Sequence, residues 1–368
     1  MTLPALDTLD TPALVVDVAR MDRNLTRVGD DLAQARVSVR PHWKTSKCIE
    51  VARRQLAVGA VGFTCSTPGE VRALGEAGIR GLLWAHLPVG VHKIAFAVEA
   101  VRRYGAMLMV DSLSVARPLN AALYEAGLVA DVVLEVDTGL GRTGVEPVSA
   151  VAVADELATL PSLRLRGVMT HEGHLYGFGA DRAALDAAAV ASAQTLVGVA
   201  EALRAARYAI EVVSVGSTPG LAAGPYVSGV TEARPGTYVF QDGNQVRLGT
   251  CPLDDCALTV LARVVSTQRS GTAIIDAGSK AMSSDAVSAE TGYGMVLDMD
   301  CRPLEGVTFP RANEEHGFLA GRGTASLSVG DLVRVLPHHA CATVNMWSEL
   351  VAVMPDGSDE RWPVVARH

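Results

Sequence analysis

Short apolar runs alternate with longer alanine-rich runs between Arg36 and Glu232, and this alternation constrains the fold more than any other feature of the sequence. Runs of about four to eight β-branched and apolar residues favour strands, whereas longer runs of good helix formers favour amphipathic helices. The predicted strands are Val37–Arg40, Gly62–Cys65, Leu82–Trp84, Met107–Asp111, Val132–Asp137, Leu163–Thr170, Glu211–Gly216 and Val227–Glu232. Helical patterns such as Val91–Tyr104 separate these eight strands, so the sequence predicts a (β/α)8 TIM barrel.

The sequence changes after about Arg247 to short alternating segments broken by Gly, Pro and Asp, such as GTAIIDAG and GDLVRVLPHHACATV. This pattern is typical of strands joined by turns. We therefore predict an α/β protein with two domains: the barrel over residues 19–245 and a second, β-rich C-terminal domain over residues 246–368. We expect the N-terminal strand Ala13–Val18 to join the second domain, so residues 1–18 are assigned to it.

Composition and charge exclude several classes of protein. Hydrophobic residues make up 49% of the chain and charged residues 20%, which is an ordinary globular balance. The net charge is −8 and no basic run is long enough to follow a phosphate backbone, so no nucleic-acid partner is expected. The N-terminus carries acids where a secretory signal carries basic residues, and no uncharged apolar stretch of about 18 residues follows. We therefore expect a cytoplasmic protein that does not bind a membrane.

Lys44, in the segment RPHWKTSK, follows the first predicted strand and so lies at the end of the barrel where such enzymes carry their chemistry. The neighbouring His42 and Trp43 would dehydrate the amine, which favours loss of its proton and a Schiff base with a carbonyl cofactor. Position alone leaves a second interpretation open, because most lysines are solvated surface charges.

The segment VSVGSTP (213–219) places a glycine and two hydroxyl residues after a predicted strand. Backbone N–H groups of Gly216, Ser217 and Thr218 can there form a concave binding site for an anion such as a phosphate. An ordinary turn is the alternative interpretation of these residues. Arg234–Tyr238, after the last predicted strand, would supply a second phosphate element, since barrels bind phosphate in the loops after strands seven and eight.

The six cysteines are too widely scattered for a disulfide framework, so each is expected to be a thiol or a metal ligand. His339 and Cys341 are two residues apart in PHHACATV, and on an extended strand both would face the same side and could bind one ion. Core packing is the alternative explanation of this pair. A thiolate with an imidazole suits Zn²⁺, whereas a carboxylate in place of the thiolate would favour Mn²⁺ or Mg²⁺.

Several segments, taken together and in order, resemble the alanine-racemase-like pyridoxal-phosphate enzymes of the D-threonine aldolase and D-serine dehydratase group. They are TPALVVDVARMDRNL, RPHWKTSK, EVDTGLGRTGV (135–145), VMTHEGHLYG (168–177), VSVGSTP (213–219), GVTEARPGTYVFQD (229–242), IIDAG (274–278), NEEHG (313–317) and PHHACATVN (337–345). The resemblance covers nearly the whole chain. It implies a barrel with a β-rich domain, a homodimer, and pyridoxal 5′-phosphate joined to Lys44.

The resemblance also implies roles for the residues that match the family's motifs. Arg142 would hold the phenolic oxygen of the cofactor, as a permanent cation can. His171 would lie against the pyridine ring, with Tyr176 nearby as a further catalytic candidate. Gly236 and Tyr238 match the family's second phosphate element. The residue that contacts the pyridine nitrogen is not identified by these motifs.

His339 and Cys341 match the pair that binds a divalent metal beside the cofactor in this family, and the thiol favours Zn²⁺ over Mn²⁺ or Mg²⁺. The implied substrate is a small D-β-hydroxy-amino acid. In a dehydratase, Lys44 would remove the α-proton while the metal draws off the β-hydroxyl as a Lewis acid, giving a keto acid and ammonia. D-Serine, D-threonine and D-threo-3-hydroxyaspartate are the implied substrates.

Other activities remain open on the sequence. An aldolase would cleave the bond between the α and β carbons and give glycine and an aldehyde. We favour the dehydratase, because family members with a His-x-Cys pair most resemble dehydratases and those with a carboxylate in the pair resemble aldolases. An amino-acid racemase would have no use for the metal pair, and a pyridoxal-phosphate carrier protein would need neither the metal nor the second domain.

Overall fold

The computed structural model describes residues 6–285 and 292–367. Within this part the chain forms two compact units. The barrel unit contains residues 27–44 and 51–236, and the sheet unit contains the described residues of 1–26, 45–50 and 237–368. The borders predicted after residues 18 and 245 remain predictions.

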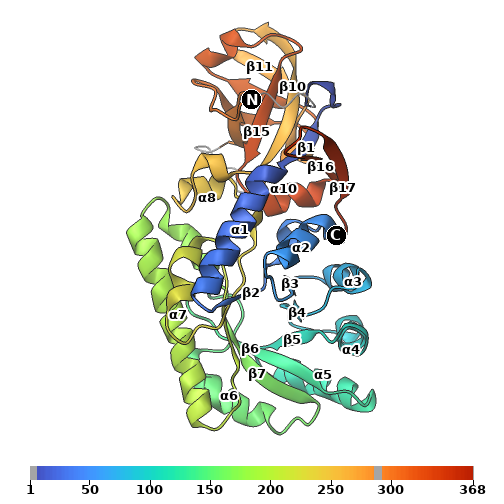
Figure 1. Cartoon of the computed structure of the whole chain (residues 1–368), viewed down its shortest axis with the longest axis vertical. Helices are drawn as coiled ribbons and strands as arrows, with labels where there is room; N and C mark the ends of the chain where they lie inside the picture. Colours follow the sequence, from blue (N-terminus) through green and yellow to red (C-terminus); the bar gives the residue numbers. More distant parts are fainter. Residues whose placement is uncertain (1–5, 286–291, 368) are drawn as a thin grey trace. The chain divides into compact units, whose positions relative to one another are not determined.

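Eight parallel strands form the barrel unit, which confirms the predicted barrel (Figure 1). They are β2 (Ser38–Val39), β3 (Phe63–Cys65), β4 (Leu82–Trp84), β5 (Met107–Val110), β6 (Ala130–Glu135), β7 (Leu163–Met169), β8 (Val212–Val215) and β9 (Glu232–Ala233). They pair in chain order from β3 to β9, and β9 pairs with β2. Isolated parallel bridges from Val39 to Ala60 and from His42 to Thr64 join β2 to the β3 side, so the sheet closes on itself.

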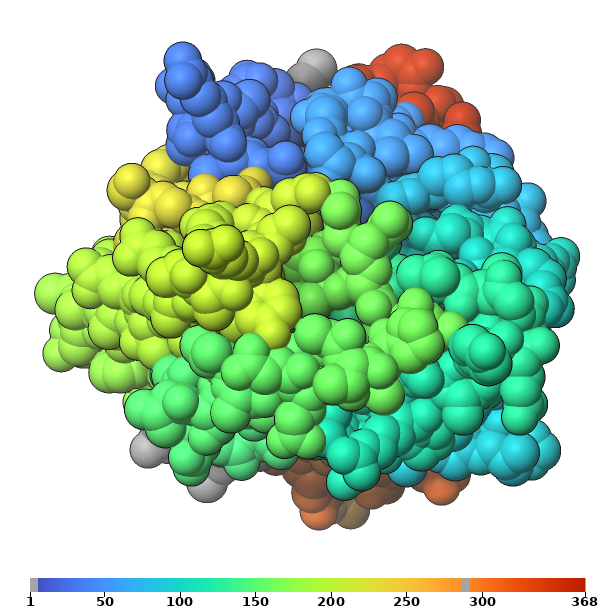
Figure 2. Space-filling view, turned by 90° about the horizontal axis from the view of Figure 1, so that it is seen from below, coloured from blue at the N-terminus to red at the C-terminus, as the bar shows by residue number. Residues whose placement is uncertain are grey.

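Helices alternate with these strands, and the colours of Figure 2 follow one another around this unit in chain order. The helices are α1 (Val18–Gln34), α2 (Ile49–Ala57), α3 (Pro68–Glu76), α4 (Val91–Tyr104), α5 (Leu113–Glu125), α6 (Ala150–Leu157) and α7 (Arg182–Ala205). Local signals set their ends. Thr67 caps α3 by accepting from the Glu70 N–H, ahead of a proline in the first turn, and α4 ends at Gly105 in the left-handed conformation.

Helix α7 is the one helix in the described part of the chain that is long and apolar enough to cross a membrane by length and composition alone. One face of it is buried, through residues such as Leu185, Ala189, Leu196 and Leu203. It packs against β7 and β8, so its apolar residues serve the core of the barrel unit.

The barrel interior has an apolar half and a charged half. Leu83, Met109, Val133 and Met169, from the consecutive strands β4 to β7, form one buried cluster. On the opposite side Glu232 accepts hydrogen bonds from Arg40 Nε (2.8 Å) and Ser214 Oγ (2.7 Å). Arg234, which is also buried, donates to Ser214 Oγ and to the Thr170 carbonyl. A buried charge is costly unless it is paired, so these charged residues do not serve the stability of the core alone. This side of the barrel is therefore a candidate for a binding site.

The sheet unit holds a mixed sheet in which the N-terminal strand takes part, as predicted. Its strands are β1 (Ala13–Asp17), β10 (Leu258–Arg269), β11 (Thr272–Ile275), β12 (Gly294–Leu297), β13 (Thr308–Ala312), β14 (Gly317–Ala320), β15 (Leu332–Pro337), β16 (Glu349–Val353) and β17 (Asp359–Pro363). β1 pairs antiparallel with β10 and parallel with β16. Val15, Leu261 and Val351 from these three strands share one buried cluster. Three short helices complete the unit: α8 (Gly243–Arg247), α9 (Ser279–Met282) and α10 (Ala340–Met346).

Two local predictions are wrong. The strand predicted at Val227–Glu232 is confined to Glu232–Ala233, because Val230 N–H bonds the Val227 carbonyl in a turn that passes through Gly229 at a φ of +100°. The predicted extended segment around His339 is also wrong, since β15 ends at Pro337 and helix α10 begins at Ala340.

Candidate functional site

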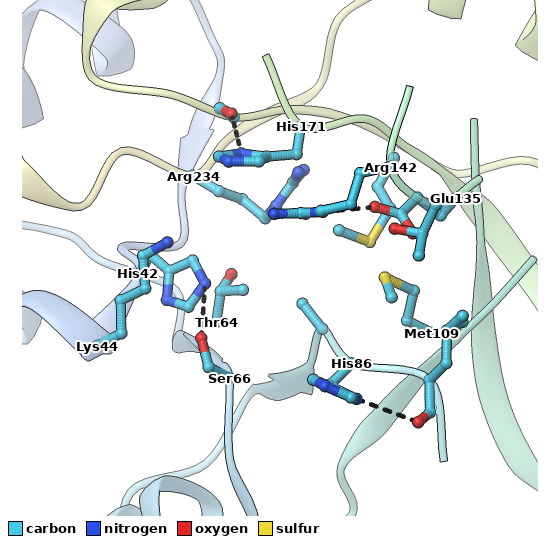
Figure 3. A pocket seen from close by; sticks show the side chains of 15 residues that line it. His42, Lys44, Thr64, Ser66, His86, Met109, Glu135, Arg142, His171 and Arg234 are labelled. Atoms are coloured by element: carbon cyan, nitrogen blue, oxygen red, sulfur yellow. Dashed lines mark hydrogen bonds and ion pairs between the residues drawn. The ribbon is translucent and has the colours of Figure 1, made fainter. Parts of the chain in front are cut away.

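A pocket opens in the barrel unit at the carboxyl ends of its strands (Figure 3). Its lining comes from segments that follow seven of the eight strands, and from strand residues beneath them: His42, Lys44, Thr64, Ser66, Ala85, His86, Leu87, Met109, Glu135, Arg142, Thr143, Met169, His171, Gly216 and Arg234. Four residues expected from the sequence meet here, namely Lys44, Arg142, His171 and Gly216. The pocket therefore occupies the end of the barrel at which such folds carry their sites.

Lys44 lies in a short 3-10 helix, η2 (Trp43–Thr45), directly after β2. Figure 3 shows it beside His42 on one wall of the pocket. Burial and the nearby cations, Lys44 first among them, hold the pKa of His42 well below its usual range, so this imidazole is neutral. His42 Nδ1 is buried and has no hydrogen-bond partner among the described residues. His42 was expected only as a neighbour of the lysine, whereas its ring is part of the pocket wall.

Arg142 reaches the pocket through a loop that Asp137 organises. The Asp137 carboxylate accepts from the N–H groups of Gly139, Leu140 and Gly141, at 2.9 to 3.1 Å. A Cβ on Gly144 would lie 2.7 Å from the Asp137 nitrogen, so the end of the loop passes close to the backbone at its beginning. This geometry explains the three glycines of DTGLGRTG, Gly139, Gly141 and Gly144, which all have positive φ.

His171 follows β7 and is fixed by the loop after β8, because its Nδ1 donates to the Gly216 carbonyl (3.0 Å). Burial, with Lys44 and Arg142 adding positive charge nearby, lowers the pKa of His171 to about 3. The imidazole is therefore neutral at any physiological pH. A neutral ring with a fixed tilt can pack against an aromatic ligand without the cost of burying a charge.

Three buried ionisable residues around this pocket were not among the individual site candidates, although Arg234 begins the segment Arg234–Tyr238 that was predicted to bind phosphate. Arg234 lines it, and burial lowers its pKa although the guanidinium stays charged. Glu135 also lines it, 4.0 Å from Arg142, with one oxygen that has no hydrogen-bond partner among the described residues. Burial raises the pKa of Glu135. Glu172, next to His171, is the third, and burial raises its pKa to about 7. No local pattern identifies the two glutamates, since each is recognised only by the burial that tertiary packing creates.

The other predicted cofactor residues lie around the pocket or outside this unit. Ser217 and Thr218 continue the buried loop from Gly216 but do not line the pocket. Tyr176 lies in the 3-10 helix η4 (Gly173–Phe178) and is likewise not among the described residues that line it. Gly236 is the last residue of the barrel unit, and Tyr238 belongs to the sheet unit, where its side chain is buried.

In the sheet unit, the side chains of His339 and Cys341 are hydrogen-bonded to each other. His339 precedes the first turn of α10 and Cys341 lies within it, so the pair meets through a helix start rather than along a strand. Burial disfavours the imidazolium, but the negative charge of Cys341, Asp242 and Asp285 outweighs it and raises the pKa of His339 to about 10. The same negative groups would attract a metal cation, which must replace this proton because a histidine ligates a metal as the neutral imidazole.

Polar groups support this pair, and all of them except Asp285 are buried. Thr45 Oγ1 lies 3.2 Å and Thr237 Oγ1 3.7 Å from the Cys341 sulfur. Asp285 accepts from His339 Nδ1, and Asp242 accepts from the Ala340 N–H (2.9 Å) between the two candidate ligands. No group of three metal-ligating side chains occurs in the described part of the chain. A pair with two protein ligands leaves coordination positions for water and substrate, as catalytic metal sites do.

Three further charged residues in the sheet unit, Asp276, Lys280 and Arg311, have structural partners. Asp276 accepts from Thr11 Oγ1 (2.5 Å) and from the Arg263 N–H (2.7 Å). Lys280 forms ion pairs with Glu314 and Glu315 at the surface. Arg311 stacks on Phe318, with its guanidinium carbon 3.7 Å from the ring centroid. These contacts explain the presence of the three residues, so none of them needs a role in catalysis.

Comparison with known proteins agrees with this arrangement. Residues 16–243 match the family described as alanine racemase, N-terminal domain, and residues 257–353 match the putative serine dehydratase domain. The chain belongs to the alanine racemase-like family. This confirms the resemblance inferred from the motifs.

D-threo-3-hydroxyaspartate dehydratase from Delftia sp. (strain HT23) is 40% identical to this alanine racemase-like chain, covering 96% of it and 97% of the dehydratase. D-threonine aldolase from Arthrobacter sp. is 31% identical, covering 98% and 93%. Two solved variants of D-threo-3-hydroxyaspartate dehydratase share 39% identity and TM-scores of 0.92 with it, covering 97% of this chain and 95% and 98% of theirs. One carries a histidine-to-alanine change, and the other a cysteine-to-alanine change and is in the metal-free form. These relatives are dehydratases and aldolases, so the alanine racemase-like chain is a lyase.

Proposed function

We propose that the chain is a pyridoxal-phosphate- and divalent-metal-dependent lyase that dehydrates a D-β-hydroxy-amino acid to a keto acid and ammonia. The observation that carries the proposal is the meeting of Lys44, Arg142, His171 and Gly216 in one pocket at the carboxyl ends of the barrel strands. The substrate is one of D-threo-3-hydroxyaspartate, D-serine and D-threonine.

The residues of the pocket fit pyridoxal phosphate. Lys44 is the one lysine among the described residues that line it, and so offers the amine for covalent attachment. The two guanidiniums of Arg142 and Arg234 suit an anionic ligand, and the neutral His171 ring offers a face for an aromatic one. The buried loop that continues from Gly216 supplies backbone N–H groups of the kind that bind phosphate.

Bound pyridoxal phosphate supplies an electron sink that acidifies the bonds at the substrate's α carbon. Lys44 Nζ takes the α-proton, as the amine on the pocket wall. Arg142 and Arg234 hold anionic oxygen and keep their charge at every working pH. His171 and His42 remain neutral because burial lowers their pKa values, so neither adds a competing cation.

The His339–Cys341 pair fits a divalent metal, and we propose Zn²⁺, because a thiolate and an imidazole are the ligands that Zn²⁺ prefers. The metal supplies Lewis acidity toward a hydroxyl group. A histidine and a cysteine are replaced in the two dehydratase variants, and the cysteine variant is metal-free. Their positions are two apart in that protein, as His339 and Cys341 are here, which supports the same assignment.

Dehydration is preferred over aldol cleavage. The dehydratase is the more similar of the two relatives, at 40% against 31% identity. The candidate metal pair here holds a thiol rather than a carboxylate, as expected for the dehydratases.

One assay separates the two reactions. The purified enzyme is incubated with each of the three D-amino acids, and keto acid and ammonia are measured beside glycine and aldehyde. We expect keto acid and ammonia in equal amounts from at least one substrate. Glycine with an aldehyde as the main products would identify an aldolase instead.

Covalent attachment of the cofactor tests the role of Lys44. The enzyme is reduced with borohydride in the presence of pyridoxal phosphate, and its peptides are mapped by mass spectrometry. We expect the cofactor mass on the peptide that contains Lys44, and no fixed cofactor in Lys44→Ala. Lys47 is the matched control: its ammonium is 2.9 Å from Asn345 Oδ1, and fragmentation of the peptide that carries both lysines should place the cofactor on Lys44 and not on Lys47. Modification of Lys47 in place of Lys44 would refute the assignment.

We further propose a cytoplasmic homodimer. All six cysteines are free, which suits a reducing compartment. The family resemblance supports the dimer, and light scattering on the purified protein measures it directly, with a monomer mass as the contrary result.

A further inference from the structure

The dipeptide His171–Glu172 holds the start of the loop after β8 by three hydrogen bonds. His171 Nδ1 donates to the Gly216 carbonyl (3.0 Å), and the Glu172 N–H donates to the same carbonyl (3.2 Å). Ser217 Oγ donates to Glu172 Oε2 (2.9 Å). This is the loop that we propose as the phosphate-binding element, so the inference drawn from it rests on the proposed function.

The single hydroxyl proton of Ser217 is already committed in this arrangement. Ser217 Oγ accepts from the Gly220 N–H (3.0 Å) and directs its proton to Glu172. A serine hydroxyl has one proton to donate. While Glu172 is ionised, the Ser217 side chain therefore has no proton left for a bound phosphate.

Glu172 is enclosed, and the fold leaves room for its carboxyl by using glycines. The side chain is 1% exposed. A Cβ on Gly220 would lie 2.9 Å from Oε2, and a Cβ on Gly224 would lie 3.3 Å from Oε1. Oε1 has no hydrogen-bond partner among the described residues. A buried carboxylate with one unsatisfied oxygen is costly, whereas the neutral acid is not.

The groups that face Glu172 do not compensate its charge fully. They are Arg234 after β9, Ser217 in the loop, and Gly220 and Gly224 from the 3-10 helices η5 (Pro219–Ala222) and η6 (Gly224–Tyr226), with His171 and His174 before and after it in the chain. Burial dominates over Ser217 and Arg234, and raises the pKa of Glu172 to about 7. Both histidines have lowered pKa values and are neutral in that range, so neither titrates with it.

We propose that Glu172 is a positioning residue of the phosphate-binding loop, and that it must be protonated for the Ser217 hydroxyl to donate to a bound phosphate. In the protonated form, the carboxyl donates to Ser217 Oγ and the Ser217 proton turns to the anion. The proton comes from solvent, so binding of the phosphate takes up one proton.

The isosteric variant Glu172→Gln isolates this effect, because its side-chain amide is neutral at every pH and can donate to Ser217 Oγ as the protonated acid does. The affinity for pyridoxal phosphate is measured from pH 6.5 to 8.5 for full-length wild type and variant, after removal of the cofactor. Titration of the ligand itself and attachment to Lys44 affect both proteins equally and cancel in the ratio of their affinities.

We expect the wild-type affinity to fall by roughly tenfold more than that of Glu172→Gln over this range, as loss of one linked proton requires. Ser217→Ala should bind more weakly and show the shallow pH dependence of the glutamine variant. Pyridoxal, which lacks the phosphate, should give the same pH dependence in all three proteins.

Equal pH dependence of wild type and Glu172→Gln toward pyridoxal phosphate would overturn the inference, as would the same difference with pyridoxal. Failure of the proposed function has another signature: the wild type would take up no pyridoxal phosphate at any pH. In that case the affinity for sulfate, whose charge is constant over this pH range, is measured instead for wild type, Glu172→Gln and Ser217→Ala.

Discussion

At the level of single residues, the unusual feature of this barrel is a set of acidic and basic side chains that are buried beside its pocket. Glu135, Glu172 and Arg234 are each at most 4% exposed, and each has a pKa shifted by burial toward the neutral form. Burial of such groups lowers the stability of the folded chain, because their charged forms lose hydration that no partner replaces fully. Their presence beside one pocket therefore indicates selection for ligand binding.

The cost of ionised Glu172 is measurable as a dependence of stability on pH. Its pKa is raised from 4.5 to about 7, so between these values the folded chain binds more protons than the unfolded chain. The contribution of Glu172 to the free energy of unfolding therefore falls as the pH rises through this window, by about 3 kcal/mol in total. Glu172→Gln lacks this loss.

Urea denaturation at pH 5 and pH 8, followed by circular dichroism without added cofactor, compares the two proteins. We expect the stability of Glu172→Gln relative to wild type to increase between pH 5 and pH 8, by up to about 3 kcal/mol. Glu211→Gln is the control, since Glu211 is exposed and pairs with Arg166 at the surface. A constant difference between Glu172→Gln and wild type across pH would contradict the assignment.

At the level of elements, the local sequence predicts the ends of those helices and strands that local interactions define. The helix predicted at Val91–Tyr104 and the strand predicted at Leu82–Trp84 have the predicted ends, because apolar periodicity and a following glycine or turn define both. The strand-end position likewise predicted that Lys44 would lie at the carboxyl end of the barrel, whereas His171 was predicted from the family resemblance, and one pocket holds both residues.

Helix α10 shows why other elements are missed. Its start depends on Asp242, which is 98 residues earlier and accepts from the Ala340 N–H while also capping α8 through the Gln245 N–H. No local pattern around His339 contains this information, so the segment was predicted as extended. Glu135 was missed for the same reason, since only the closed barrel buries it.

Asp242 therefore holds the geometry of the candidate metal pair. Asp242→Ala leaves the buried Ala340 and Gln245 N–H groups without their acceptor, and we expect a loss of about 1–3 kcal/mol in stability. Because Ala340 lies between His339 and Cys341, the affinity for Zn²⁺ should also fall roughly tenfold. Competition with a chromophoric chelator measures this affinity.

The matched control is Asp17→Ala in the same unit, which removes a carboxylate that accepts from the Arg20 N–H at the start of α1. It should lose stability but keep the wild-type affinity for Zn²⁺. An equal loss of affinity in both variants would mean that the effect is general destabilisation, and unchanged affinity in Asp242→Ala would mean that the helix start does not set the geometry of the pair.

At the level of the whole molecule, the two candidate binding sets share no residue. Lys44, Arg142, His171 and Gly216 belong to the barrel unit, and His339 and Cys341 belong to the sheet unit. The proposed function assigns attachment of the cofactor to the first set and activation of the β-hydroxyl to the second. The two proposed roles can thus be tested separately in the intact protein, by removing either the cofactor or the metal.

Chelation with EDTA should abolish formation of keto acid from the D-β-hydroxy-amino acid while leaving pyridoxal phosphate bound, because no residue of the first set ligates the metal. The absorbance of the bound cofactor and the release of keto acid are followed in the same sample. Added Zn²⁺ should restore turnover of the wild type but not of Cys341→Ala, which keeps the cofactor and lacks the thiolate ligand. Cofactor release on chelation would show that the two sets are not separable, and full turnover of Cys341→Ala in metal-free buffer would exclude the metal from the reaction.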